Sequence, residues 1–204
     1  MRAAALLGGL ALYGLAVGTI VVAAIGVSPW DVLAQGISRQ TGLLFGVVTN
    51  IVGALVLLLW IPLKQRPGIG TLLNVLIVGS MAQVAIWALP APTSLVHGVG
   101  YFAVGLVSLA VASGIYLAAD FGAGPRDGLM TGLTTRLGWP IWLSRFVVEG
   151  SVLLIGWLLG GGVGIGTLVF AVAIGPLCHM TIPFFRRRIA PGTQTSTPSR
   201  EAAR

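Results

Sequence analysis

The chain has 204 residues, of which 56% are apolar and only 8% are charged, and it carries a formal net charge of +7. A soluble domain of this size cannot bury so much apolar surface, because surface area falls too slowly with chain length. The composition therefore excludes a soluble protein and predicts an integral membrane protein, in which basic residues set orientation and no nucleic acid is expected as a partner.

Apolar runs of about 20 residues predict membrane-spanning helices. The chain contains six such runs, over 3–25, 43–63, 69–89, 95–119, 141–159 and 164–185. The first run follows Arg2 and superficially resembles a signal peptide, but it is too long for one, and we interpret it as a retained helix. We expect the polar tail, 189–204, which is rich in Pro, Ser and Thr, to be a disordered cytoplasmic segment.

Basic residues at the ends of these runs predict the orientation of the chain. With the N-terminus inside, the outer segments contain only Arg39. The cytoplasmic segments then contain Arg2, Lys64, Arg66, Arg126, Arg136 and Arg186 to Arg188. The positive-inside rule therefore predicts that both chain ends are cytoplasmic.

The sequence contains an internal repeat with an offset of 96 residues. Residues 26–42, GVSPWDVLAQGISRQTG, align without a gap with residues 122–138, GAGPRDGLMTGLTTRLG, and the same offset aligns two GIGTL segments. Each half contains three predicted spans, so the second half must enter the membrane in the opposite orientation. Many secondary transporters are built on such inverted repeats.

From the composition and the repeat we predict an all-α polytopic membrane protein. Its six transmembrane helices form two inverted three-helix repeats, over 1–93 and 94–188, and each repeat contains a short helix that is re-entrant or interfacial. The first short helix is expected to begin with Ser28 as N-cap, Pro29 at the first position and Asp31 in the first turn. In this arrangement the SPWD segment falls on the outer side and the GPRD segment on the inner side.

Two acidic residues occupy corresponding positions of the repeat. Asp31 and Asp127 either cap their helices only, or form two gates of a pathway or bind a cation or a proton. Arg126 stands beside Asp127 and is expected to neutralise it, whereas Asp31 follows Trp30 and has no basic neighbour before Arg39. If one of the two is functional on electrostatic grounds, the sequence therefore favours Asp31.

The two GIGT segments each begin a predicted span. Glycines at this spacing let helices approach closely or let the chain unwind. A glycine-rich turn can also bind an anion, but no phosphate-binding lysine follows here. We interpret these segments as packing or hinge positions, formed by Gly68, Gly70, Thr71, Gly164, Gly166 and Thr167.

Arg145 and Glu149 lie four residues apart on one face of the fifth predicted span. Ionisable residues inside a membrane are costly and indicate either a functional site or an internal ion pair. Asn50, in the second span, either reaches a central cavity or bonds a neighbouring helix. No Cys, His and carboxylate cluster has metal-ligand spacing, and no nucleophile motif is present, so we predict no metal, no cofactor and no enzyme.

The SPWD segment, the repeated GIGT and the Arg145 and Glu149 pair resemble the YczE/YyaS/YitT group of bacterial membrane proteins, most closely its YczE-like branch. The resemblance covers about residues 3–187, with departures at Gly124 and Arg126 in the second copy. It implies a small multi-pass protein of the bacterial cytoplasmic membrane. It implies little about a substrate.

We expect a transporter that moves a small solute by alternating access between the two repeats. Arg145 and Glu149 would bind the solute or couple protons, Asn50 would donate a hydrogen bond, and the Pro-x-Asp helices would line or gate the path. The alternative is a membrane scaffold or regulator of a partner protein that transports nothing, with Arg145 and Glu149 as a structural pair. The lipid bilayer surrounds the protein in either case, and the sequence leaves a homodimer open.

Overall fold

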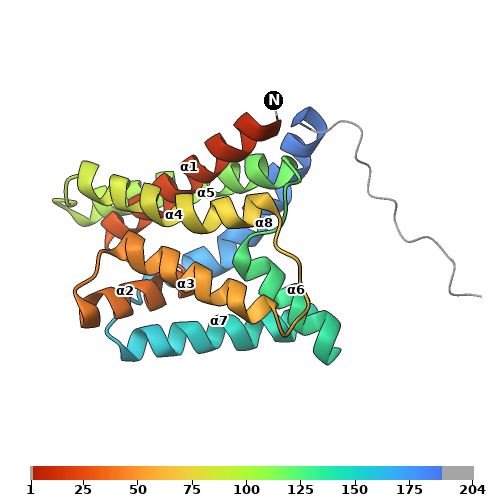
Figure 1. Ribbon diagram of the computed structural model, residues 1–204. Helices are drawn as coiled ribbons and strands as arrows, with labels where there is room; N and C mark the ends of the chain where they lie inside the picture. The colour runs from red at the N-terminus through yellow and green to blue at the C-terminus, as the bar shows by residue number, and fades with distance from the viewer. Residues whose placement is uncertain (1, 190–204) are drawn as a thin grey trace, which may run out of the picture.

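A computed structural model describes residues 2–189, and all regular secondary structure within this range is helical. The helices are α1 (Arg2–Ala23), α2 (Pro29–Thr41), α3 (Phe45–Trp60), α4 (Ile69–Ala88), α5 (Leu95–Ala118), α6 (Pro125–Leu137), α7 (Ile141–Leu158) and α8 (Ile165–Ile189) (Figure 1). The tail predicted over 189–204 lies, after Ile189, outside the described residues.

Five of these helices, α1, α4, α5, α7 and α8, are long and apolar enough to cross a membrane. α3 has 16 residues, which is about 24 Å at 1.5 Å per residue and shorter than a typical bilayer core. It qualifies only together with α2, from which it is bent by 118°. The described chain therefore has five candidate spans, or six when α2 and α3 are counted as one broken span.

The four helices α1 to α4 are followed by four helices of the same kind in the same order. α2 and α6 both have 13 residues, and they begin at Pro29 and Pro125, which are 96 positions apart. We call two residues separated by this offset equivalent. α1 packs against α5, α4 packs on α1, and α8 packs on α5.

The short helices pack across the two halves, α2 on α7 and α6 on α3. In one contact Gly128 of α6 lies directly against the ring of Trp60, whose Nε1–H donates to the Pro125 carbonyl at 3.0 Å. In the equivalent contact the sizes are reversed, because Gly156 of α7 lies against the α2 backbone beside Val32. Both contacts are close because one partner has no side chain.

The start and end of α2 follow from local chemistry. The Asp31 backbone N–H donates to the Ser28 hydroxyl at 3.3 Å, which confirms the predicted N-cap. Gly42 ends the helix in the left-handed region, at φ 73°, where glycine carries no steric penalty. α6 begins without a side-chain cap, because Gly124 replaces the serine, and it ends in the same way at Gly138.

Each GIGT segment bonds the turn that precedes the short helix of the other half. The Gly70 N–H donates to the Phe121 carbonyl at 2.9 Å, and the equivalent Gly166 N–H donates to the Ile25 carbonyl at 2.9 Å. The two halves are therefore joined by a reciprocal pair of hydrogen bonds.

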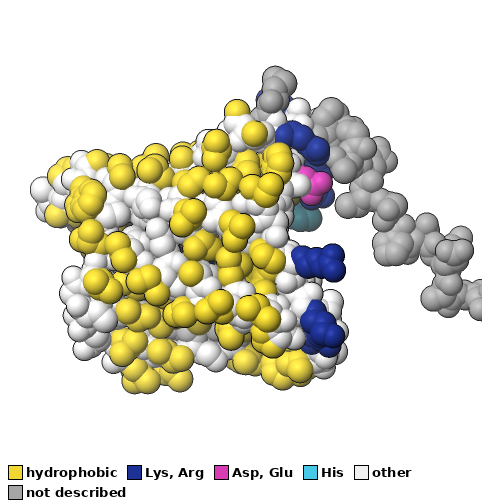
Figure 2. Space-filling view, viewed as in Figure 1, with side chains coloured by type: hydrophobic (Ala, Val, Ile, Leu, Met, Phe, Trp, Pro, Cys, Tyr) yellow, Lys and Arg dark blue, Asp and Glu magenta, His cyan; other side chains and the backbone are white. Residues whose placement is uncertain are grey.

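The charged side chains gather at one end of the molecule in the view of Figure 2. The start of α1 and the end of α8 lie at this end (Figure 1), and the last turn of α8 contains three arginines. The C-terminus of α6, with Arg136 in its last turn, points the same way. Both ends of the described chain thus lie on one side of the bundle, which agrees with six spans and not with five.

Candidate functional site

The first turns of α2 and α6 meet in the interior of the bundle. Arg126 Nη2 lies 3.6 Å from Asp31 Oδ1, and the guanidinium carbon lies 5.2 Å from the centre of the Trp30 ring. Trp30 and Asp31 are only 6% and 3% exposed. From this point the two short helices run toward opposite ends of the molecule (Figure 1). The expectation that the SPWD and GPRD segments lie on opposite sides is therefore wrong for their first turns, because the turns before α2 and α6 lead the chain back into the bundle.

The two aspartates at this junction differ in their partners. Asp31 accepts a hydrogen bond from the Ser28 hydroxyl at 2.5 Å and forms the ion pair with Arg126. Within the described residues the Asp127 carboxylate has neither a hydrogen bond nor an ion pair, since Gly124 replaces the serine and Arg126 turns to the other helix. Arg126 therefore makes its ion pair with Asp31 and no direct ion pair with Asp127.

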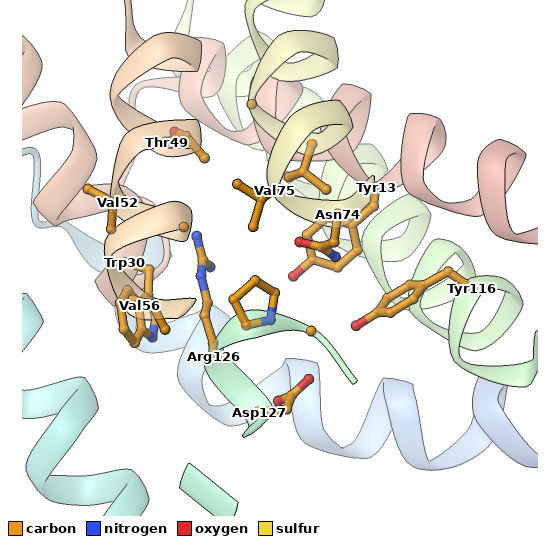
Figure 3. A pocket seen from close by; sticks show the side chains of 15 residues that line it. Tyr13, Trp30, Thr49, Val52, Val56, Asn74, Val75, Tyr116, Arg126 and Asp127 are labelled. Carbon is orange, nitrogen blue, oxygen red and sulfur yellow. The ribbon is translucent and has the colours of Figure 1, made fainter. Parts of the chain in front are cut away.

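Two cavities adjoin the junction. A cavity of about 490 Å³ lies among α5, α6, α7 and α8, and a cavity of about 80 Å³, shown in Figure 3, lies among α3, α4 and α6. The residues that line both are Tyr13, Trp30, Tyr116, Arg126 and Asp127. We call these five residues the partition, because they border both cavities.

The walls of the two cavities are built from equivalent positions. The pairs are Thr49 and Arg145, Gly53 and Glu149, Val75 and Ala171, Val78 and Ile174, and Gly79 and Gly175, the first of each in the small cavity and the second in the large one. The cavities differ in volume because α3 packs on α4, whereas α7 and α8 are not a packed pair in the described chain.

Polar side chains hold α3 against α4. The Gly46 N–H donates to Gln83 Oε1 at 3.0 Å, and Asn50 Nδ2 donates to the Leu76 carbonyl at 3.3 Å and to Ser80 Oγ at 3.2 Å. The positions equivalent to Gly46, Asn50, Ser80 and Gln83 are Trp142, Phe146, Pro176 and His179. Asn50 thus bonds a neighbouring helix and lines neither cavity, so the structure favours the interhelical alternative over a solute contact.

Arg145 and Glu149 lie on the wall of the large cavity. Arg145 Nε is 3.2 Å from Glu149 Oε1, and the side chains are 60% and 34% exposed. The pair is confined to α7 and joins it to no other helix. The geometry is consequently that of an ion pair within one helix that also borders a cavity.

The GIGT segments form helix starts in contact with backbone. The Gly68 N–H donates to Thr71 Oγ1 at 3.2 Å, and the Gly164 N–H donates to Thr167 Oγ1 at 3.3 Å. Gly70 and Gly166 form the reciprocal bonds between the halves. These glycines and threonines line neither cavity.

The sequence reasoning missed Tyr13 and Tyr116. Their rings pack edge to face with centroids 5.8 Å apart, and both border the two cavities. Both occur inside apolar runs, where an aromatic residue is more often part of a packed core. Their polar hydroxyl groups were the one feature of the sequence that could have indicated a place beside a cavity.

The described residues contain no group of three His, Cys, Asp or Glu side chains that could hold a metal ion. The arrangement at the partition is instead one of separated charges, aromatic rings and helix N-termini around a cavity. Such an arrangement suits noncovalent binding of a small polar solute.

Comparison with known proteins places the chain in a family. Residues 1–183 match DUF6198, a family of unknown function. An uncharacterized protein of Haemophilus influenzae is 39% identical over 185 residues, which is 91% of this chain and 83% of the relative. The uncharacterized membrane protein YczE of Bacillus subtilis is 32% identical over 166 residues, 81% of this chain and 77% of the relative.

A second Bacillus subtilis protein, the uncharacterized protein YyaS, is 26% identical over 185 residues, 88% of this chain and 91% of the relative. No solved structure matches the chain. The name of the YczE relative describes it as a membrane protein, which agrees with the long apolar helices of this chain. The chain therefore belongs to the DUF6198 family of unknown function and is a YczE-like, multi-pass membrane protein.

Proposed function

We propose that the protein is a small-solute transporter that works by alternating access between two inverted repeats. One observation carries the proposal, namely the two cavities of about 490 and 80 Å³ that equivalent residues build on either side of one partition. In an alternating-access transporter one repeat is open while the other is closed, and the two exchange roles around a central site.

The inverted orientation is supported by charge and by contacts. The basic residues at one end of the bundle favour cytoplasmic chain ends. With three spans in each half, the second half then runs against the first. The reciprocal bonds of Gly70 to Phe121 and of Gly166 to Ile25 are what an approximate two-fold axis in the membrane plane would produce.

In this orientation the large cavity opens toward the cytoplasm. Its wall includes Arg145, near the start of α7, and Ile182, four residues before the arginines that end α8. The small cavity is the narrower outer counterpart. The described conformation is thus inward-facing in this proposal.

The partition acts as the central gate. Arg126 and Trp30 are equivalent residues that lie against each other on the proposed axis, with Asp31 Oδ1 3.6 Å from the guanidinium. A solute passes when Arg126 leaves Trp30, α3 separates from α4, and α7 approaches α8. Wall residues of the large cavity, including Arg145 and Glu149, accompany the solute on the cytoplasmic side.

The proposal is tested by thiol labelling after Cys178→Ser. Single cysteines at Thr41 and Leu137, the exposed C-terminal residues of α2 and α6, report the orientation of the halves. Inversion predicts that an impermeant thiol reagent reaches Thr41→Cys in intact cells and Leu137→Cys in inside-out vesicles. Reaction of both positions from the same side would contradict the inverted repeat.

Two further cysteines report the cavities. Ala171→Cys in the large cavity should react from the cytoplasmic side, and Thr49→Cys, only 9% exposed beside the small cavity, should react more slowly from outside as the outer cavity opens. Gly100→Cys, on an exposed helix face away from both cavities, serves as the lipid-facing control. A Thr49→Cys variant that never reacts from outside would favour the scaffold alternative.

A further inference from the structure

Trp30 contributes a buried donor that no group in the described protein satisfies. Its indole Nε1 has no hydrogen-bond partner, although the residue is only 6% exposed and borders both cavities. A buried donor left without a partner is rare and costs free energy. Because this donor lies beside a cavity, a ligand with an acceptor group would satisfy it. The Arg126 guanidinium, 5.2 Å from the ring centre, offers further donors at the same place.

Asp127 contributes the opposite chemistry. Its side chain is exposed and borders both cavities, and its carboxylate has no hydrogen bond or ion pair within the described residues. Asp127 Oδ2 and the Tyr116 hydroxyl both flank Gly124, and the Tyr13 ring packs against Tyr116. A carboxylate beside aromatic faces is a typical receptor for an ammonium group.

The charges around the large cavity favour a ligand that carries both an anionic and a cationic group. Arg126 pairs with Asp31 and Arg145 pairs with Glu149, so Asp127 is the one acidic residue of the described cavity lining without a direct ion pair. The N-termini of α2 and α6 meet here and oppose this charge with partial positive charge. A ligand with only an anionic group would lie near the Asp127 carboxylate without a cationic group to offset that charge. A ligand with only a cationic group would leave the Trp30 Nε1–H without an acceptor.

We infer that the large cavity binds a small zwitterion, with its anionic group at Trp30 and Arg126 and its primary ammonium group at Asp127. This inference rests on the proposed transport function and names the class of its solute. A free α-amino acid is the simplest ligand of this kind, and a cavity of about 490 Å³ is of the size that small-molecule sites occupy.

The same chemistry occurs in the phosphoethanolamine headgroup of a lipid. The large cavity extends into the gap between α7 and α8, so a headgroup could reach it from the bilayer as well. Both ligands have a primary ammonium group close to an anionic group. The experiment below distinguishes the free amino acid from the lipid headgroup.

The first measurement is binding to the purified full-length protein in detergent. The twenty common amino acids and phosphoethanolamine are tested by thermal shift, and each ligand that stabilises the protein is titrated calorimetrically. Its decarboxylated amine and its deaminated acid are titrated beside it. The inference predicts that the zwitterion binds at least about tenfold more tightly than either analogue, because each analogue leaves one charged partner unmet.

Two variants assign the contacts. Asp127→Asn should weaken binding of the zwitterion about tenfold or more, and Trp30→Phe, which removes only the N–H and one ring, should weaken it severalfold. Asp120→Asn is the matched control, because Asp120 borders neither cavity and asparagine tolerates its left-handed backbone, φ 61°. Its affinity should equal that of the native protein.

The lipid arm uses nanodiscs of phosphatidylcholine with and without phosphatidylethanolamine. Stabilisation by phosphatidylethanolamine that Asp127→Asn abolishes, without binding of free amino acids, would assign the site to a headgroup. The inference is overturned if no zwitterion binds, if an amine alone binds as tightly, or if Asp127→Asn binds normally. Binding without transport in proteoliposomes would instead refute the proposed function and leave the site in place.

Discussion

The α3–α4 side and the α7–α8 side of the bundle occupy equivalent places and yet differ in packing. On the first side Gln83 and Asn50 bond across the helix pair, and only about 80 Å³ of cavity remains. On the second side Phe146 and Pro176 occupy positions where those bonds would form, and the cavity measures about 490 Å³. The comparison teaches that a repeated backbone supplies two cavities, whereas a few unrepeated side chains decide how large each one is.

The first turns of α2 and α6 show the same relation on a smaller scale. Ser28 holds Asp31, but its equivalent Gly124 has no hydroxyl to hold Asp127. Arg126 replaces a tryptophan and pairs with the acid of the opposite helix. Two substitutions in the repeat thus convert two identical acids into one paired and one unpaired carboxylate.

The largest effect is expected from fixing the small cavity closed. A Cβ at Gly53 would lie 3.7 Å from Val75 Cβ, which matches disulfide geometry. In the Cys178→Ser background, the oxidised Gly53→Cys and Val75→Cys double variant should lose amino-acid uptake into proteoliposomes completely, and a reductant should restore it. The single variants should not respond to the reductant, and full uptake by the oxidised protein would break the proposed link between cavity and transport.

The next effect concerns the packing of α6 on α3. Gly128→Ala places a methyl group into the Trp60 ring, whereas Gly100→Ala, also in a helix, meets no atom within 4 Å. Overpacking of this kind costs about 1–3 kcal/mol, so the Gly128 variant should melt several degrees lower and the Gly100 variant should not. Equal melting temperatures in detergent would show that the contact is not rigid.

A smaller effect is expected from the polar contact between α3 and α4. Asn50→Leu removes both hydrogen bonds to α4, and an interhelical bond in a membrane contributes about 0.6 kcal/mol. Outside labelling of Thr49→Cys should therefore rise about threefold or more. Phe146→Leu, at the equivalent and 73% exposed position, is the control and should leave that rate unchanged. A faster rate in both would argue against a specific role of Asn50.

The smallest effect is expected at the ion pair of α7. Glu149→Gln removes a pair within one helix whose side chains are 60% and 34% exposed, so the loss of stability should stay below about 0.5 kcal/mol. Membrane abundance and melting temperature should match those of the native protein. A marked fall in abundance would identify the pair as structural and support the scaffold alternative.

Local chemistry determined the helices. The predicted run 69–89 became α4 (Ile69–Ala88) and the run 95–119 became α5 (Leu95–Ala118), because an apolar stretch in a membrane satisfies its own backbone only as a helix. The cap at Ser28 was equally readable, since it depends on residues three positions apart. The span predicted over 43–63 was too long, because α3 ends at Trp60 and the chain then turns.

The sequence by itself therefore determined a helical membrane protein with an internal repeat and one basic end, because hydrophobicity, charge and capping act over a few residues. Only the tertiary structure decided which aspartate Arg126 pairs with, that Tyr13 and Tyr116 border both cavities, and that the two cavities differ in size. Arg126 and Asp31 are far apart along the chain, and their contact depends on how the first turns of α2 and α6 come together in the bundle. Neighbouring residues alone could not indicate it, because charges in a low-dielectric interior pair by distance in space and not by order in the chain.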